Sequence, residues 1–316
     1  MIDAILSTIE RGQRFLIASH GNPDGDALAS TLALAIALSE MGKEVVAYNQ
    51  DGLSDELSFL PGASLVVDTI AADQSFDAGF ILDSGELRRA GSHLKDYCQT
   101  LVNIDHHPHS ENFGSIYYVD ETACATGALI YRILQAAGHA ISQPVATCIY
   151  TAILTDTGSF RYSNADPEAF NIAAELVGLG VSPWEVSANI YENRPAEQLR
   201  LLTAALDTLI VSDCGRLGAL SVTEQMLAET GTGPEHTDGL INYPRSIRGV
   251  KVALLFRQAS DDCFKVGFRS KGEVNVGELA RQLGGGGHHN AAGATLSGDL
   301  GTIQQMVFSR LQSLLP

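Results

Sequence analysis

The chain has 316 residues, 45% of them hydrophobic and 18% charged, and a formal net charge of −17. This composition excludes a disordered chain and leaves enough apolar material for one large or two smaller domains. The charge is uneven, because residues 1–185 hold eight basic and 24 acidic side chains, whereas residues 186–316 hold twelve and thirteen. An acidic surface repels long polyanions, so we expect no binding to long duplex nucleic acid.

The cysteines and the apolar runs indicate a cytoplasmic location. Five dispersed cysteines without a CxxC pair are typical of buried thiols in a reducing compartment. The N-terminus lacks the basic start of a signal peptide, and the longest apolar stretch, residues 27–38, is too short to span a bilayer. We therefore expect a cytoplasmic protein that is not associated with a membrane.

The first 180 residues predict an α/β domain. Strand-like runs occur at 15–18, 44–48, 78–82 and 100–104, and helix-like runs at 28–41, 125–137, 144–154 and 167–179. The alternation of the two predicts a doubly wound, mostly parallel sheet. In such sheets, ligands bind beyond the carboxyl ends of the strands.

The rest of the chain predicts a smaller α+β domain at 207–316, after a partly helical linker at 186–206 and with a cleft between the two domains. Its strand candidates are 208–211, 217–222, 250–256 and 264–268, and its helix candidates are 276–283 and 302–314. Between Arg245 and Arg281 there are eight basic and four acidic residues. This local excess of positive charge predicts a small anion site.

Histidine and aspartate side chains that follow apolar segments form a candidate metal site. They are His20, Asp24, Asp26, Asp83, His106 and Asp156. Since the carboxyl ends of parallel strands meet at one edge of a sheet, we expect these side chains to converge there. Imidazole and carboxylate ligands without thiolates suit manganese or magnesium, and two histidines favour manganese. Two such ions that share Asp83 would activate water for attack on phosphorus, which predicts phosphoester hydrolysis.

Each of these motifs also has a purely structural interpretation. Asn22-Pro-Asp-Gly25 is a strong turn sequence, Asp83 occupies a position typical of a helix N-cap, and Asp156 ends a predicted helix. We favour the metal site because three candidate ligands fall within residues 20–26, and because a carboxylate after an apolar segment needs a compensating charge.

The sequence Asp105-His106-His107 adds a second indication of a metal site. A carboxylate beside a histidine commonly fixes the tautomer that binds metal. We therefore predict His106 as a ligand and His107 as a metal or phosphate contact, whereas His109 is expected at the surface.

The run from Gly284 to Gly287, followed by His288, is either a flexible linker or a ligand-binding segment. It lies between a predicted helix and an apolar segment, which is unusual for a linker. Glycine turns expose successive backbone N–H groups that bind anions. We predict phosphate or nucleotide binding here, with Arg269 and His288 donating charge-assisted hydrogen bonds.

Together these motifs resemble the DHH phosphoesterase superfamily with its DHH-associated C-terminal domain. The resemblance is carried by HGNPDGDA at 20–27, ILDSG at 81–85, DHH at 105–107, TDTGSFRYS at 155–163, FRS at 268–270 and GGGGHHNAAGA at 284–294. The motifs follow family order over nearly the whole chain. Size and architecture are closest to the NrnA-like branch, whose members degrade very short RNAs and often dephosphorylate 3′-phosphoadenosine 5′-phosphate. The resemblance implies a metal-binding catalytic domain at 1–185 and a substrate-binding domain at 207–316.

The resemblance also implies a role for each matching residue. His20 and Asp24 would bind one manganese ion, Asp26, His106 and Asp156 the other, and Asp83 would bridge them around a nucleophilic hydroxide. Magnesium or cobalt would be substitute metals. His107 would contact the scissile phosphate and assist protonation. The nucleotide would be gripped by the C-terminal residues Arg269, Ser270, Gly285, Gly286, Gly287 and His288.

The resemblance implies a manganese-dependent oligoribonuclease that also converts 3′-phosphoadenosine 5′-phosphate to AMP. Its partners would be short single-stranded RNA, dinucleotides and that nucleotide; the oligomeric state is left open, a homodimer included. The nearest alternative is a phosphodiesterase for cyclic or linear dinucleotides such as cyclic di-AMP. Inorganic pyrophosphatases of the superfamily lack the glycine-rich segment, and the six intact candidate ligands argue against a binding module without turnover.

Overall fold

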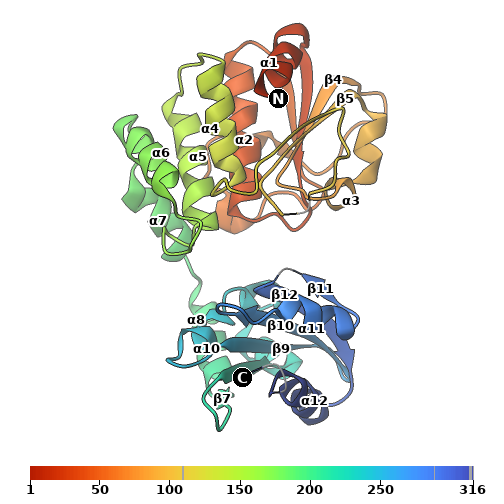
Figure 1. Ribbon diagram of the computed structural model, residues 1–316, viewed down its shortest axis with the longest axis vertical. Helices are drawn as coiled ribbons and strands as arrows, with labels where there is room; N and C mark the ends of the chain where they lie inside the picture. The colour runs from red at the N-terminus through yellow and green to blue at the C-terminus, as the bar shows by residue number, and fades with distance from the viewer. Residues whose placement is uncertain (109, 288, 313–314, 316) are drawn as a thin grey trace. The chain divides into compact units, whose positions relative to one another are not determined.

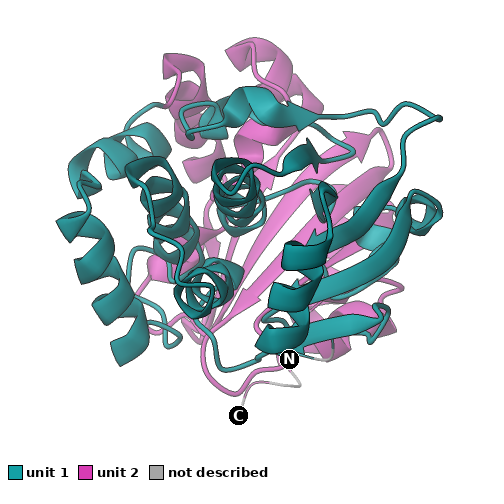
Figure 2. Ribbon diagram, turned by 90° about the horizontal axis from the view of Figure 1, so that it is seen from above, with its two compact units in different colours: residues 1–193 teal, residues 194–316 magenta. Residues whose placement is uncertain are grey.

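The computed structural model describes residues 1–108, 110–287, 289–312 and 315, and it divides into two compact units, residues 1–193 and 194–316 (Figure 2). His109 and His288 lie outside the described residues. The segment expected to be a linker, 186–206, falls on the end of helix α7 (Pro183–Tyr191) and on helix α8 (Ala196–Leu206). Leu201 and Ala205 of α8 are buried in a core of the second unit, so α8 folds as part of that unit.

The first unit contains six parallel strands in the order β3-β2-β1-β4-β5-β6. They are β1 (Arg14–Ser19), β2 (Glu44–Tyr48), β3 (Val66–Val67), β4 (Phe76–Leu82), β5 (Cys98–Asp105) and β6 (Ile116–Val119). Strands β1, β2, β4 and β5 form where the apolar runs predicted them. The doubly wound α/β fold predicted for the first domain is therefore confirmed.

Helices and short 3₁₀ turns connect these strands. The α-helices are α1 (Ile2–Arg11), α2 (Gly25–Glu40), α3 (Leu87–Ala90), α4 (Thr126–Ala136), α5 (Gln143–Asp156) and α6 (Pro167–Gly178), followed by α7. The 3₁₀ turns are η1 (Asp55–Leu57), η2 (Ala63–Leu65) and η3 (Ser92–Asp96). Among the described residues, no helix combines the length and apolar character needed to cross a membrane.

Both faces of the first sheet are buried, which is why its strands are continuous apolar runs. Along β1, Phe15 and Ile17 face the core formed with α2, α4 and α5, whereas Leu16 and Ala18 face a smaller core on the opposite side. Helix α2 is apolar on all sides because it is enclosed by the sheet, α4 and α5 (Figure 1). The sheet and α2 form a rigid base for the residues that follow β1, β4 and β5.

The strand order reverses between β1 and β4. From β1 the chain proceeds outward to β2 and β3, and from β4 it proceeds in the other direction to β5 and β6. At such a switch point the connections diverge to opposite sides, which leaves room for a ligand beyond the carboxyl ends of the two central strands. His20 and Asp83 are the first residues after β1 and β4.

The second unit is a mixed sheet in the order β11-β12-β10-β9-β8-β7, in which only the β8 and β9 pair is parallel. Its strands are β7 (Ile210–Val211), β8 (Leu217–Val222), β9 (Val252–Ser260), β10 (Cys263–Ser270), β11 (Gly286–Gly287) and β12 (Ala291–Ser297). The helices are α8, α9 (Glu224–Thr230), η4 (Pro234–Thr237), α10 (Asn242–Ser246), α11 (Val276–Gln282) and α12 (Leu300–Gln312). This confirms the smaller α+β domain.

Candidate metal centre

The six predicted ligands come together at the carboxyl edge of the first sheet. His20, Asp83 and His106 follow β1, β4 and β5, while Asp24 and Asp26 stand at the start of α2 and Asp156 ends α5. Ligand atoms of His20, Asp24 and Asp83 lie within 4.8 Å of one another, as do those of Asp26, His106 and Asp156. We call these groups the first triad and the second triad.

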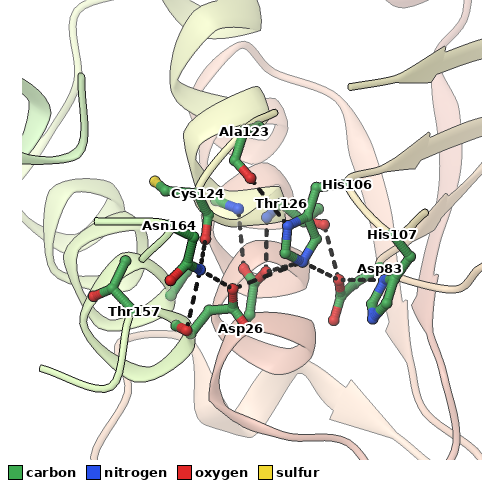
Figure 3. A network of polar contacts seen from close by, with 12 residues as sticks. Asp26, Asp83, His106, His107, Ala123, Cys124, Thr126, Thr157 and Asn164 are labelled. Atoms are coloured by element: carbon green, nitrogen blue, oxygen red, sulfur yellow. Dashed lines mark hydrogen bonds and ion pairs between the residues drawn. The ribbon is translucent and has the colours of Figure 1, made fainter. Parts of the chain in front are cut away.

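Asp83, a member of the first triad, also faces the second. The residue is 1% exposed, and its Oδ2 lies 3.5 Å from His20 Nε2. Its Oδ1 lies 3.6 Å from His106 Nε2 (Figure 3). Each carboxylate oxygen thus faces a different triad. A carboxylate in this position can bridge two cations a few ångströms apart.

Both triad histidines present the nitrogen that suits a metal. His20 Nδ1 is 2.9 Å from the carbonyl oxygen of Gly21, and His106 Nδ1 is 3.2 Å from that of Ala123. A carbonyl oxygen can only accept a hydrogen bond, so each Nδ1 carries a proton, and in the neutral form of each ring the lone pair lies on Nε2. Both Nε2 atoms point toward the carboxylates.

Asp26 and Asp156 are each held by hydrogen bonds from surrounding protein groups. Asp26 is 1% exposed and accepts the backbone N–H groups of Thr126 at 2.7 Å and Gly127 at 3.0 Å, together with the Ser30 hydroxyl at 2.8 Å. Asp156 accepts Nδ2 of Asn164 at 3.0 Å. These bonds fix the direction in which the carboxylates point (Figure 3).

The close packing and burial of the carboxylates and histidines in this centre shift their pKa values. Burial, reinforced by the Asp83 carboxylate, raises the pKa of Asp26 well above its ordinary range, and burial raises the pKa of Asp156 to about 6. Burial would also raise the pKa of Asp83, but hydrogen bonding to His20 and the charges of His107 and His106 hold it at about 2. Burial lowers the pKa of His106, yet the carboxylates of Asp26, Asp156 and Asp83 outweigh it and raise the value to about 9.

The residues present fit divalent cations. Among the described residues, the ion pairs of Asp24, Asp26, Asp83 and Asp156 involve only histidines, never lysine or arginine. Buried carboxylates without such compensation are costly. Four carboxylates and two imidazoles, each of which can present a deprotonated Nε2 to a metal, are a donor set suited to manganese or magnesium.

Asp105 orients His107. The sequence had led us to expect that Asp105 fixes the tautomer of the predicted ligand His106. The buried Asp105 Oδ1 accepts His107 Nδ1 at 2.8 Å and the backbone N–H groups of His106 and His107. The tautomer of His106 is instead fixed by the carbonyl of Ala123. Because His107 Nδ1 is committed to Asp105, that nitrogen is the proton donor and not a metal ligand.

The predicted nucleotide-gripping residues lie in the second unit. Arg269 is half-buried near the end of β10, and its Nη1 donates to the carbonyl of Phe268 at 3.1 Å. Ser270 is 2% exposed; its hydroxyl donates to the carbonyl of Val274 at 2.6 Å and accepts Asn290 Nδ2 at 2.8 Å. These bonds close the loop after β10, so the Ser270 hydroxyl serves that loop. His288 lies outside the described residues.

The glycine run is partly the turn that was expected, because Gly284 lies in the turn after α11 with φ +79, and partly an edge strand. Gly286 and Gly287 pair with Gly293 and Ala292 of β12. A Cβ atom on Gly285 would lie 2.1 Å from the Gly293 carbonyl oxygen, and one on Gly287 2.4 Å from Ala292 Cα, so neither position admits a side chain. Gly286 is exposed, and a Cβ atom there would meet nothing within 4 Å.

Four groups around the triads were not found from the sequence. They are the Ser30 hydroxyl, the Ala123 carbonyl, Thr126 and Asn164. The backbone carbonyl carries no side-chain signal, and Thr126 was noted only as part of a predicted helix. Asn164 follows the TDTGSFRYS motif directly, which is the one sequence signal that could have identified it.

Comparisons with known proteins agree with this architecture. The DHH family, N-terminal domain, matches residues 14–153, and the DHHA1 domain matches residues 219–313. A relative from Thermus thermophilus, named bifunctional oligoribonuclease and PAP phosphatase NrnA, is 35% identical over 301 residues, which cover 95% of this chain and 89% of the relative. A relative of the same name from Bacillus subtilis is 26% identical over 92% of both chains.

A solved structure shares the fold over nearly the whole chain. It is an exopolyphosphatase-related protein from Bacteroides fragilis, with a TM-score of 0.91 and 27% identity, and the match covers 98% of this chain and 94% of the other. The family matches in both units and the 35% identity to the Thermus thermophilus relative show that the present chain belongs to the DHH family of phosphoesterases, as its motifs predicted.

Proposed function

We propose that this chain is a manganese-dependent phosphoesterase that hydrolyses very short RNA oligonucleotides to mononucleotides. The proposal includes removal of the 3′-phosphate from 3′-phosphoadenosine 5′-phosphate, which yields AMP. The observation that carries it is the position of Asp83, which presents one carboxylate oxygen to each triad. Relatives named oligoribonuclease and PAP phosphatase, similar along most of their length, support the substrate class.

Two metal positions per chain belong to this proposal. The first would be formed by His20, Asp24 and Asp83, and the second by Asp26, His106, Asp156 and the same Asp83. Ions bound there would supply Lewis-acid charge and activate a water for attack on phosphorus. Manganese is favoured over magnesium because each position includes an imidazole.

His107 would contact the scissile phosphate. Burial lowers the pKa of His107, but the hydrogen bond to Asp105 and the Asp83 charge outweigh this effect and raise it. The hydrogen bond to Asp105 keeps a proton on His107 Nδ1. The raised pKa favours the ring that is protonated on both nitrogens, and its Nε2–H can donate a hydrogen bond to a phosphate oxygen. This role requires no metal contact from His107.

The second unit would bind the nucleotide through Arg269, Gly285, Gly286, Gly287 and His288. Arg269 is the charged candidate on β10, and Gly286 is the exposed glycine at which nothing in the protein occupies the space of a side chain. Glycine permits the closest approach of a ligand to the backbone. Ser270 would act indirectly, by closing the loop beside Arg269.

A reducing compartment such as the cytoplasm fits the cysteines, which are part of the same proposal. All five are free thiols; Cys124 and Cys148 are buried as expected, whereas Cys98 and Cys263 are half-buried and Cys214 is exposed. Burial raises the pKa of Cys124 and Cys98 to about 12, which makes these two thiols unreactive.

The test is a comparison of substrates on one preparation of the protein with manganese. RNA dimers to decamers, 3′-phosphoadenosine 5′-phosphate, cyclic di-AMP, its linear product and pyrophosphate are assayed side by side for kcat/KM. The proposal expects the shortest RNAs to be the best substrates and the bisphosphate nucleotide to be cleaved as well. A preference for cyclic or linear dinucleotides of adenosine over other short RNAs would replace it with the dinucleotide phosphodiesterase, and preference for pyrophosphate would reject both.

A further inference from the structure

A short buried segment before and within the first turn of α4 forms hydrogen bonds with three of the four ligands of the second metal position. We call residues 123–127 the α4 platform. The carbonyl of Ala123 accepts His106 Nδ1 at 3.2 Å, and the N–H groups of Thr126 and Gly127 donate to Asp26 at 2.7 and 3.0 Å. The Thr126 hydroxyl donates to Asp83 Oδ1 at 2.9 Å.

The fourth ligand is reached through one intermediary. Asn164 Nδ2 donates both to the carbonyl of Cys124 at 2.9 Å and to Asp156 Oδ2 at 3.0 Å. Figure 3 shows these contacts gathered around the platform. One stretch of five residues therefore bonds three ligands from three separate segments of the chain directly, and a fourth through Asn164.

The first metal position is built differently. Among the described residues, the side-chain hydrogen bonds of His20 and Asp24 go to nearby backbone groups, to the carbonyl of Gly21 and the N–H of Ala27. Asn49, which follows β2, supports this loop by donating to the carbonyl of His20 at 2.9 Å. In the described part of the chain, Asp83 alone of the first-position ligands forms a hydrogen bond with the platform.

The platform is packed tightly enough to impose its geometry. Ala123, Cys124, Ala125 and Thr126 are at most 3% exposed. A Cβ atom on Gly127 would lie 2.4 Å from Cβ of Ala152, so α4 meets α5 closely at this point. A close-packed interior transmits small displacements instead of absorbing them.

We infer that Thr126 is a positioning residue that sets the second metal position by orienting Asp83 through its hydroxyl and Asp26 through its backbone N–H. The inference concerns the metal centre of the proposed function and rests on that function only for the identity of the ions. A carboxylate can only accept, so the Thr126 hydroxyl must donate to Asp83 Oδ1, the oxygen that faces His106. This hydrogen bond restricts the direction in which Asp83 Oδ1 can present its remaining lone pair to the second position.

The test uses Thr126→Val, which removes the hydroxyl but keeps the backbone N–H and the side-chain shape, and Thr126→Ser, which keeps the hydroxyl. The matched control is Thr31→Val, because Thr31 is equally buried in α2 and its hydroxyl bonds only to the carbonyl of Ala27. Manganese binding is measured by calorimetry without substrate. His20→Asn isolates the second position and Asp156→Asn isolates the first.

In the His20→Asn background, Thr126→Val is expected to weaken manganese binding about 10- to 100-fold, the usual cost of losing a group that orients a metal ligand. In the Asp156→Asn background the change should be smaller than about threefold, because Oδ2 faces the first triad and Oδ1 alone loses its donor. Thr126→Ser and Thr31→Val are expected to retain wild-type affinity at both positions. In the otherwise unmutated protein, the loss of kcat in Thr126→Val should recover as manganese is raised, with little change in KM.

Hydrogen exchange of the amides at 123–130 shows whether the platform itself remains intact in Thr126→Val. If that variant does not fold, Thr126→Ala, which also lacks the hydroxyl, provides the same comparison, again with the second position alone expected to weaken. Unchanged affinity in the tested variant, or equal losses at both positions, overturns the inference while leaving the proposed function standing. Failure of the wild-type protein to bind manganese overturns the proposed function instead.

Discussion

The backbone N–H of Asp83 donates to the carbonyl oxygen of Ile104 at 3.0 Å, so the pairing of β4 with β5 continues one residue beyond the end of β4. Asp83 has φ +52, a left-handed conformation that costs about 1 kcal/mol or more for most residues and is most readily tolerated by asparagine and aspartate. The chain turns sharply there, at the point where the carboxylate stands between the two triads.

Asp83→Asn should abolish binding at both metal positions while preserving the fold. Asparagine tolerates the same backbone conformation and has nearly the same volume, but it lacks the negative charge that both positions share. We expect activity on every substrate to fall by about 1000-fold or more, the equivalent of about 4 kcal/mol of lost transition-state stabilisation. Calorimetry with manganese and circular dichroism check the two halves of the prediction; retention of one tight manganese site would contradict the shared role.

His107→Asn should separate substrate contact from metal binding. Because His107 Nδ1 is committed to Asp105, the substitution removes a phosphate contact but no metal ligand. The expected result is unchanged manganese stoichiometry with kcat lower by about 100- to 10,000-fold, the usual contribution of a positioned acid or base. Loss of a manganese ion would instead make His107 a ligand. His139→Asn, on a histidine paired with Glu40 on the helices, is the matched control.

Metal binding should release protons near neutral pH. In the metal-free protein the pKa of His106 is raised from 6.5 to about 9, because the carboxylates of Asp26, Asp156 and Asp83 outweigh burial. A bound metal requires the unprotonated Nε2, so affinity at the second position should rise with pH and level off above about 9. Calorimetry at pH 7.5 in buffers of different ionisation enthalpy measures the released protons; no buffer dependence would contradict the raised pKa.

The raised pKa of His106 also predicts how the stability of the metal-free protein depends on pH. A raised folded-state pKa means that folding favours the protonated His106, so its stabilisation is fully present below pH 6.5 and is lost as the pH rises through about 9. The melting temperature of the metal-free protein should fall as the pH rises across this window. The increase in melting temperature on adding manganese should become larger over the same range. In His106→Asn the fall should be smaller than in the wild type.

Gly285→Ala and Gly286→Ala should affect different properties. A Cβ atom at Gly285 would overlap the Gly293 carbonyl, so we expect a loss of about 1–3 kcal/mol in the free energy of unfolding. At Gly286 the space is open, so stability should stay within about 0.5 kcal/mol, whereas KM for short RNA should rise if a ligand approaches this backbone. Denaturant unfolding and steady-state kinetics measure the two effects. An unchanged KM in Gly286→Ala would remove Gly286 from the substrate site.

Sequence patterns were sufficient where the information is local. The apolar runs predicted β1, β2, β4 and β5 to within about two residues, because a strand buried on both faces must be continuously apolar. Helices α1 and α3 and strands β3 and β6 of the first unit were not predicted; α3 and β3 are too short to carry a periodicity. The glycine run was expected as a turn because glycine favours turns, and its pairing with β12 depends on a partner outside the local sequence.

The amino-acid sequence by itself determined the fold class, the family and which side chains could bind metal, because each follows from residue types at characteristic positions after predicted strands. Only the tertiary structure decided that Asp83 turns one oxygen to each triad, that Ala123 rather than Asp105 sets the tautomer of His106, and that Thr126 lies against both Asp26 and Asp83. The physical reason is distance along the chain. Hydrogen bonds between residues 43 and 100 positions apart form only after the strands pair and α4 packs against α2 and α5, so no local pattern records them.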